Sequence, residues 1–287
     1  MRYTTIITAE TLYQNLANPD WVIMDCRFSL SNLQSGELAY RQGHLPQARY
    51  AHLNNDLSSM LGSLTGRHPL PNFKALSEKL GAWGIHSRSQ VVVYDDMNGA
   101  FAGRLWWLLR CLGHDHVAVL DGGLTHWRRL GLPMTTRLPR IKAADFRAYL
   151  NQAHWLTATD VQAGLSRKTI CLLDARTPER YQGIQEPIDP VAGHIPSALN
   201  RPIQNNLAPN GLLLPAAQLK QQFKQLISNH SAEQVVHYCG SGVTACHNVL
   251  AMEYAGLSDS KLYAGSWSDW ISNKNRPITA LGTIING

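Results

Sequence analysis

The sequence lacks several features that define common protein classes. Its 287 residues include five cysteines, and no two of them form a Cys-x-x-Cys pair, so neither a zinc site nor a disulfide framework is predicted. No apolar run is long enough to cross a bilayer, and residues 1–7 lack the apolar segment of a signal peptide. We therefore expect a cytoplasmic protein with reduced thiols, no bound metal and no membrane partner.

Charge is also scarce, at 16% of the residues, with 26 basic and 20 acidic side chains. Lysine and arginine are scattered along the chain, and the densest local group is Arg128-Arg129. This distribution predicts no nucleic-acid partner. The small positive excess is compatible with an anionic small substrate and also with an ordinary soluble surface.

What the sequence does contain is an internal duplication. Four blocks occur twice in the same order, 143 to 150 residues apart, and so long a period predicts two tandem domains rather than a solenoid. The blocks are an apolar run with Asp-x-Arg, a Gly-His-x-Pro motif, a second apolar run ending in Asp or Cys, and a tryptophan segment. They lie at 21–27 and 170–176, 43–48 and 193–198, 91–95 and 235–239, and 122–127 and 265–270.

Each half alternates short apolar runs with segments of helical period, which is typical of an α/β domain with a mostly parallel sheet flanked by helices. We predict a first domain over 1–135, a linker over 136–155 and a second domain over 156–287. The predicted strands cover 21–25, 90–94, 117–120, 169–173, 234–238 and 261–263. The predicted helices cover 9–16, 73–83, 100–112, 124–130, 158–165, 216–227, 243–255 and 267–271.

The most informative segment is Cys239-Gly240-Ser241-Gly242-Val243-Thr244, which directly follows an apolar run. Ligands of open α/β sheets bind beyond the carboxyl ends of the strands. Backbone N–H groups and a helix N-terminus at such a place stabilise an anion and lower the pKa of a thiol. Glycine is costly unless the backbone requires it, so two glycines favour a reactive thiolate over a structural cysteine. Asp95 holds the equivalent place in the first half, which is therefore predicted to be catalytically inactive.

These repeated blocks resemble the two-domain rhodaneses, which are sulfurtransferases with tandem rhodanese-like domains, over about residues 4–280. The loop Cys-Gly-Ser-Gly-Val-Thr resembles the 3-mercaptopyruvate sulfurtransferase branch, because the thiosulfate branch usually has two basic residues after the cysteine. The resemblance implies that Cys239 accepts a sulfur from a small anionic donor as a persulfide. An acceptor then removes it, such as cyanide, a low-molecular-weight thiol or a thioredoxin-like protein. No metal or organic cofactor is implied.

The resemblance also assigns roles to further residues. The backbone N–H groups of Gly240 to Thr244, together with the hydroxyls of Ser241 and Thr244, would hold the persulfide. Arg180 matches the substrate-binding arginine of the family, whose planar guanidinium binds a carboxylate or sulfonate through two bonds. A salt bridge to Glu179 or Asp174 is the alternative for Arg180.

His44, in the Gly-His-Leu-Pro block, matches a family histidine proposed to join Ser241 in proton transfer to the leaving enolate. Its duplicate His194 favours instead a turn-anchoring role for both histidines. His68, in a proline-bounded loop, could also reach the site.

One position departs from the mercaptopyruvate branch, because Asp189 stands where a second substrate arginine is expected. Arg67, Arg201 or a cation of the first domain could replace it. This departure keeps thiosulfate:cyanide sulfurtransferase as an alternative function, and a non-catalytic persulfide carrier or binding module is a further one. A cysteine phosphatase is disfavoured, because it needs an arginine where Ala245 lies.

Overall fold

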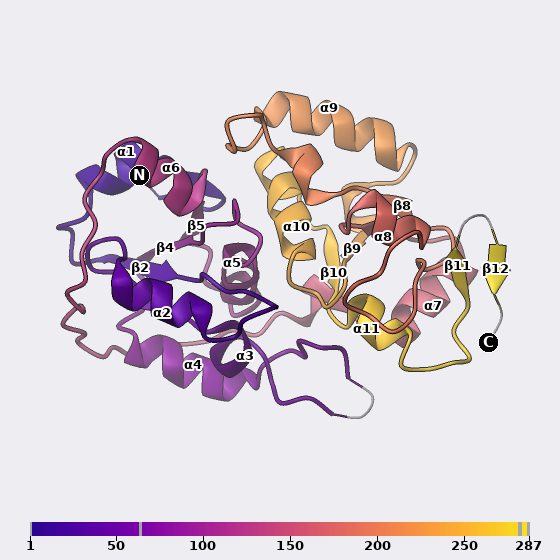
Figure 1. Ribbon diagram of the computed structural model, residues 1–287, viewed down its shortest axis with the longest axis horizontal. Helices are drawn as coiled ribbons and strands as arrows, with labels where there is room; N and C mark the ends of the chain where they lie inside the picture. Colours follow the sequence, from indigo (N-terminus) through magenta and orange to yellow (C-terminus); the bar gives the residue numbers. More distant parts are fainter. Residues whose placement is uncertain (1, 63–64, 281–282, 286–287) are drawn as a thin grey trace. The chain divides into compact units, whose positions relative to one another are not determined.

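The computed structural model describes residues 2–62, 65–280 and 283–285. These residues form two compact units (Figure 1). The first contains the described residues within 1–59, 70–151 and 209–213, and the second those within 60–69, 152–208 and 214–287. Each unit therefore includes a short segment from the half of the sequence that otherwise builds the other unit. Nothing in the sequence repeat indicates this exchange.

A five-stranded parallel sheet forms the centre of the first unit, in the order β1-β5-β4-β2-β3. Its central strands are buried on both faces, as is usual for parallel sheets. The strands are β1 (Ile6–Ile7), β2 (Trp21–Asp25), β3 (Arg49–Tyr50), β4 (Gln90–Tyr94) and β5 (Val117–Leu120). The helices are α1 (Ala9–Gln14), α2 (Ser35–Gln42), α3 (Leu53–Asp56), α4 (Phe73–Ala82), α5 (Ala102–Cys111) and α6 (Gly123–Arg129).

The second unit has the same strand order in its corresponding elements, β6-β10-β9-β7-β8, again all parallel. The strands are β6 (Trp155–Leu156), β7 (Cys171–Asp174), β8 (Leu199–Asn200), β9 (Val235–Tyr238) and β10 (Lys261–Tyr263), with an antiparallel pair β11 (Ile278–Ala280) and β12 (Thr283–Ile285). The α-helices are α7 (Ala158–Ser166), α8 (Pro178–Gln182), α9 (Ala216–Ile227), α10 (Ala245–Tyr254) and α11 (Ser266–Trp270). Three short 3-10 helices are η1 (Gln152–His154), η2 (Ile203–Asn206) and η3 (Ala232–Gln234).

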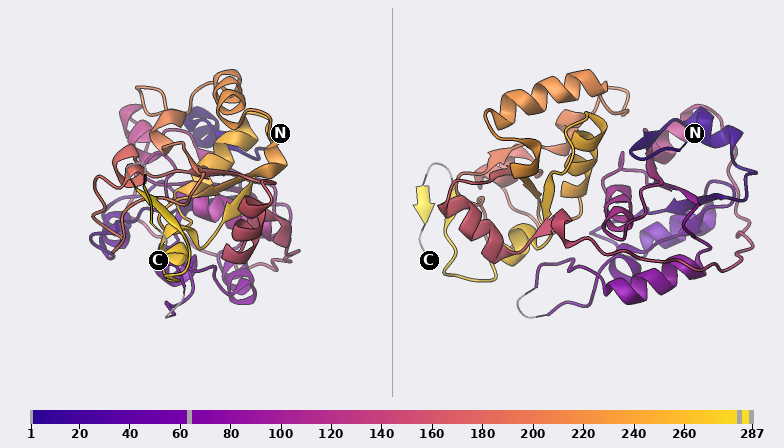
Figure 2. Two further views of the ribbon diagram at one scale, coloured as in Figure 1. Left: turned by 90° about the vertical axis from the view of Figure 1, so that its right-hand side faces the viewer. Right: turned by 180° about the vertical axis from the view of Figure 1, so that it is seen from behind.

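Helices cover both faces of this second sheet (Figures 1 and 2). The α7 and α11 helices pack on the face that carries Leu172, Val236 and Tyr238. The α10 helix packs against β9 from the other side, where the His237 ring lies 3.2 Å from the Met252 sulfur, and α9 packs against α10. The predicted fold class is confirmed: each unit is an α/β domain with a parallel sheet flanked by helices. No helix among the described residues is long and apolar enough to cross a lipid bilayer.

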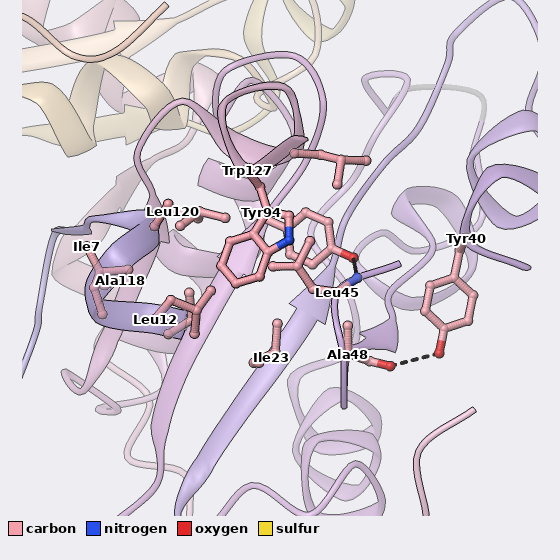
Figure 3. Packing of buried hydrophobic residues seen from close by; sticks show 13 residues of the cluster. Ile7, Leu12, Ile23, Tyr40, Leu45, Ala48, Tyr94, Ala118, Leu120 and Trp127 are labelled. Carbon is pink, nitrogen blue, oxygen red and sulfur yellow. Dashed lines mark hydrogen bonds between the residues drawn. The ribbon is translucent and has the colours of Figure 1, made fainter. Parts of the chain in front are cut away.

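The core of the first unit shows how the repeated motifs hold the fold. Figure 3 shows Tyr94 and Trp127 beside aliphatic side chains of α1, β1, β2 and β5. The Tyr40 hydroxyl donates to the Ala48 carbonyl at 2.8 Å, and the Leu45 N–H donates to the Tyr94 hydroxyl at 3.2 Å (Figure 3).

The second unit repeats these bonds with Tyr181, Ala198, Ile195 and Tyr238. The Gly-His-x-Pro blocks are thus tied to the sheet in the same way in both units.

Candidate active site

Cys239 lies immediately beyond the carboxyl end of β9 and is almost fully buried. Its N–H donates to the Ser266 hydroxyl at 3.1 Å, and its carbonyl accepts from the Trp267 N–H at 3.0 Å. Ser266 has a left-handed backbone with φ of 56° and begins α11. The turn between β10 and α11 therefore fixes the backbone of the cysteine on the neighbouring strand.

The two glycines that follow Cys239 serve different purposes. Gly242 has φ of 75°, and a Cβ atom there would lie 2.1 Å from the Ala264 carbonyl oxygen, so only glycine fits. A Cβ atom on Gly240 would lie 2.7 Å from Nη2 of Arg67 and 3.3 Å from Nη2 of Arg180. Gly240 therefore lets two guanidinium groups approach the backbone next to the thiol.

The loop after Cys239 favours the ionised thiol. Burial raises the pKa of the Cys239 thiol, but hydrogen bonds from the Thr244 hydroxyl and from the backbone N–H groups of Ser241, Ala245 and Val243 outweigh it. The pKa consequently lies below its ordinary value of 9.0. The thiolate is the nucleophilic form of cysteine. Of these donors, the Ala245 amide lies outside the group predicted from the sequence, which ended at Thr244.

A buried network of ion pairs holds Arg180 near the thiol. Its Nε lies 3.0 Å from both carboxylate oxygens of Glu186, and its Nη2 lies 3.0 Å from Oδ2 of Asp189. The other oxygen of Asp189 forms an ion pair with Nη1 of Arg67. One buried carboxylate is therefore shared between two guanidinium groups. Arg180 is therefore salt-bridged, but to Glu186 and Asp189 rather than to Glu179 or Asp174. Substrate binding by Arg180 stays a prediction.

Segment 60–69 brings a histidine to the same loop. The Nδ1 atom of His68 lies 2.7 Å from the Ser241 hydroxyl, and both residues are buried. The neighbouring Arg67 N–H donates to the Ser268 hydroxyl at 3.0 Å, and Gly66 packs tightly on the Gly265 carbonyl. Contacts of His68 and of the two residues before it thus secure residues 66–68 within the second unit.

His44 has a different environment in the first unit. Its Nδ1 lies 2.8 Å from the Tyr40 carbonyl, its Nε2 lies 3.2 Å from the Arg137 carbonyl, and its ring stacks on that of Tyr40. His194 repeats the first contact and the stacking with Tyr181. These contacts fit the turn-anchoring alternative, whereas a catalytic role for His44 stays a prediction.

Arg201, a candidate for the missing second arginine, is occupied elsewhere. Its guanidinium donates to the Asn206 side chain, the Asn205 carbonyl and the Gln222 side chain at 2.8 to 3.0 Å. It therefore helps to hold the segment around η2. Arg67 is the candidate that lies beside the Cys239 loop.

The equivalent loop of the first unit already contains its own anion. The Asp95 carboxylate is fully buried, and each of its oxygens accepts two backbone N–H bonds, all at 2.8 Å. The donors are Met97, Gly99, Phe101 and Ala102. Both units therefore form a ring of amides around the residue after the central strand, and only the second places a thiol in it.

Comparison with protein families agrees with this duplicated architecture. The model of the rhodanese-like domain family matches twice, over residues 8–130 and 157–273. The chain belongs to the rhodanese family. The two matched segments coincide with the two halves in which the sequence blocks recur, and they carry Asp95 and Cys239 respectively.

Individual rhodanese-family relatives cover nearly the whole chain. A Pseudomonas aeruginosa protein named "Probable 3-mercaptopyruvate sulfurtransferase" is 45% identical over 280 residues, covering 97% of this chain and 99% of its own. A Rattus norvegicus protein named "Thiosulfate sulfurtransferase" is 31% identical over 269 residues, covering 91% of this chain and 89% of its own. The crystal structure of SseA from Escherichia coli, described as a 3-mercaptopyruvate sulfotransferase, matches with a TM-score of 0.79 and 29% identity. The match covers 93% of this chain and 100% of the SseA chain.

The sequence named Arg67 and His68 as residues that could reach the site, but it did not show the contacts that they make there. Segments 60–69 and 209–213, which precede the equivalent helices α4 and α9, are the two exchanged segments. The first contains Arg67 and His68, whereas the second reads Pro-Asn-Gly-Leu-Leu and has no ionisable side chain. The segment with Arg67 and His68 thus belongs to the unit that contains Cys239, and the segment without ionisable side chains belongs to the unit that contains Asp95.

Proposed function

We propose that this protein is a sulfurtransferase that transfers a sulfur from 3-mercaptopyruvate to a thiol or cyanide acceptor through a Cys239 persulfide. The observation that supports the proposal most strongly is the environment of Cys239. A buried thiol with a lowered pKa lies among the Thr244 hydroxyl and three backbone amides, beside the guanidinium groups of Arg67 and Arg180. These groups suit a thiolate nucleophile and a donor that carries a carboxylate.

The reaction divides into two transfers. The Cys239 thiolate attacks the donor sulfur, the donor C–S bond breaks, and its electron pair passes to the carbon to form the enolate of pyruvate. The proton of the donor thiol moves to this carbon, so pyruvate leaves and Cys239 keeps a persulfide anion. The acceptor thiolate or cyanide then attacks the outer sulfur, and the Cys239 thiolate is restored. The amides of Ser241, Val243 and Ala245 are suited to stabilising the persulfide anion.

We assign the proton transfer to Ser241 and His68 rather than to His44. The 2.7 Å contact between Nδ1 of His68 and the Ser241 hydroxyl lies within the loop that holds the thiol. A hydrogen-bonded hydroxyl and imidazole can carry a proton from the donor thiol to the enolate carbon.

Thiosulfate is the second candidate donor, because several relatives carry its name and two guanidinium groups near the thiol suit a dianion. The two residues after Cys239 are uncharged, and this favours mercaptopyruvate. We further propose a cytoplasmic location, where reduced thiols persist, with a low-molecular-weight thiol or a thioredoxin-like protein as the natural acceptor.

Steady-state kinetics with both donors, and with cyanide as the common acceptor, test the proposal. Wild type should give the higher kcat/KM with mercaptopyruvate, and Cys239→Ser should lose at least about 1000-fold, as enzymes do without their nucleophile. Cys171→Ser removes another buried thiol, from β7, and should retain activity. Preference for thiosulfate would overturn the donor assignment. No turnover by folded wild type with either donor would leave a carrier or binding module.

A further inference from the structure

Arg67 combines features that the proposed reaction does not yet explain. Its side chain is partly buried, its Nη1 pairs with Asp189, and its Nε is buried with no hydrogen-bond acceptor among the described residues. Its Nη2 is the atom nearest to where a Cβ of Gly240 would lie. A guanidinium has five N–H donors in a fixed fork, so the Nη2 end of Arg67, which lies beside Gly240, is the part of the fork that can bind a ligand next to Cys239.

Arg180 is more fully engaged by protein carboxylates. Its Nε and Nη2 contact Glu186 and Asp189, and Glu186 is itself paired with Arg176. The pKa of Arg67 is lowered, mainly because burial opposes the charge, while the nearby Cys239 thiolate favours it. Arg67 therefore lies close enough to the reacting sulfur for the two charges to interact.

We propose that Arg67 is a specificity-determining residue that binds the carboxylate of the sulfur donor, with Asp189 as the positioning residue that holds it. This inference rests on the proposed function and names the part of the site that recognises the donor. Sequence comparison alone placed an acid, Asp189, where a cation was expected. The structure shows that acid paired with a cation from a distant segment, 60–69. The positive charge is thus supplied by a different part of the chain.

The assignment also explains the role of segment 60–69 in the second unit. Two adjacent residues of this segment contact the site, Arg67 through Asp189 and His68 through Ser241. Arg67 would bind the donor carboxylate at one end while His68 acts, through Ser241, at the end where the C–S bond breaks. One short segment would therefore orient both ends of the donor over Cys239.

Alkylation of Cys239 tests the assignment without any sulfur donor. Iodoacetate and iodoacetamide react with the same thiolate by loss of iodide, but only iodoacetate carries a carboxylate. Both rate constants are followed by mass spectrometry of the Cys239 peptide. The rate constant with iodoacetate is divided by that with iodoacetamide, and any change in the pKa of the thiol cancels in this ratio. Arg67→Ala should lower this ratio about 10- to 100-fold, the value of one or two charge-assisted hydrogen bonds, and Arg67→Lys should lower it less.

Control and rescue variants separate recognition from loss of structure. Arg167→Ala removes an exposed arginine of the second unit and should leave the ratio unchanged. Arg67→Asp should lose the preference for iodoacetate. The double variant Arg67→Asp with Asp189→Arg should recover most of it, because the ion pair is kept with its charges exchanged and position 189 then supplies the guanidinium. No recovery in the double variant would contradict the role of Asp189.

An unchanged ratio in Arg67→Ala, with normal iodoacetamide reactivity, would overturn the role of Arg67. That outcome is independent of turnover, so it is distinguishable from failure of the proposed sulfurtransferase activity, which the wild-type kinetics decide. In those kinetics, Arg67→Ala should raise KM for mercaptopyruvate more than it lowers kcat.

Discussion

The Asp95 carboxylate offers a quantitative test of how the first unit stabilises its loop. It is fully buried and accepts four backbone N–H bonds of 2.8 Å. The donors lie in the turn after β4 and at the start of α5. The carboxylate therefore ties the sheet to the helix that covers it, in the place where the second unit keeps a thiol.

Asp95→Asn preserves the shape of the side chain and replaces one oxygen by an NH2 group. Whichever oxygen is replaced, two backbone N–H groups lose their acceptor and face a donor. Hydrogen bonds to a charged group contribute about 1.5–3 kcal/mol each, so the loss should be about 3–6 kcal/mol. Folded proteins have only about 5–15 kcal/mol in total, so the first unit should become close to unstable.

Urea unfolding of wild type and variant measures this loss. Asp145→Asn is the matched control, because Asp145 is exposed and forms an exposed ion pair with Arg147, and its cost should stay below about 1 kcal/mol. If Asp95→Asn unfolds within about 1 kcal/mol of wild type, the four bonds do not stabilise the loop as inferred.

Two further predictions concern the thiol and the acid stability of the second unit. Thr244→Val removes the hydroxyl that lowers the pKa of Cys239, so alkylation by iodoacetamide at pH 7 should slow about 10- to 100-fold. Thr244→Ser should react normally, and equal rates for all three proteins would exclude a role for the hydroxyl. Burial lowers the pKa of His237 from 6.5 to about 3, so the stability due to its neutral ring is present above pH 6.5 and lost as pH falls towards 3. Between pH 6.5 and 5, wild type should lose about 1.5–2 kcal/mol of unfolding free energy relative to His237→Gln, and parallel pH profiles would contradict this.

The two units illustrate how a duplicated loop can serve either structure or chemistry. In the first, a carboxylate satisfies the amides permanently and the loop becomes part of the core. In the second, the amides and Thr244 surround a thiol whose charge depends on pH. The same backbone arrangement therefore surrounds a structural carboxylate in one unit and a reactive thiol in the other.

The sequence predicted the central strands well, because these are apolar runs bounded by polar residues. The strands β2, β4 and β5 have the predicted bounds. It missed the edge strands β1, β3, β6 and β8, since two residues give no detectable alternation. It also missed α2 over 35–42, which begins without a capping side chain.

The candidate site was predictable with its contacts only where its residues are adjacent in sequence; Arg67 and His68 were named as candidates, but their partners were not. The loop from Cys239 to Thr244 is one continuous motif, and Arg180 lies in a recognisable block. The contacts of Arg67 and His68 depend on which unit segment 60–69 joins, and this is set by tertiary packing on Gly265 and Ser268. The pairing of Asp189 with Arg67 likewise cannot be read from either position alone.

The most direct test of the central claim is to look for the intermediate on Cys239. Purified protein is mixed with mercaptopyruvate in the absence of an acceptor, and mass spectrometry locates any added sulfur among the five cysteines. Fragment spectra distinguish Cys239 from Cys246, because no Lys or Arg separates the two. Transfer through Cys239 predicts a gain of one sulfur atom on Cys239 alone, matched by one pyruvate released and reversed by cyanide. Pyruvate release without sulfur on Cys239, or sulfur on another cysteine, would contradict it.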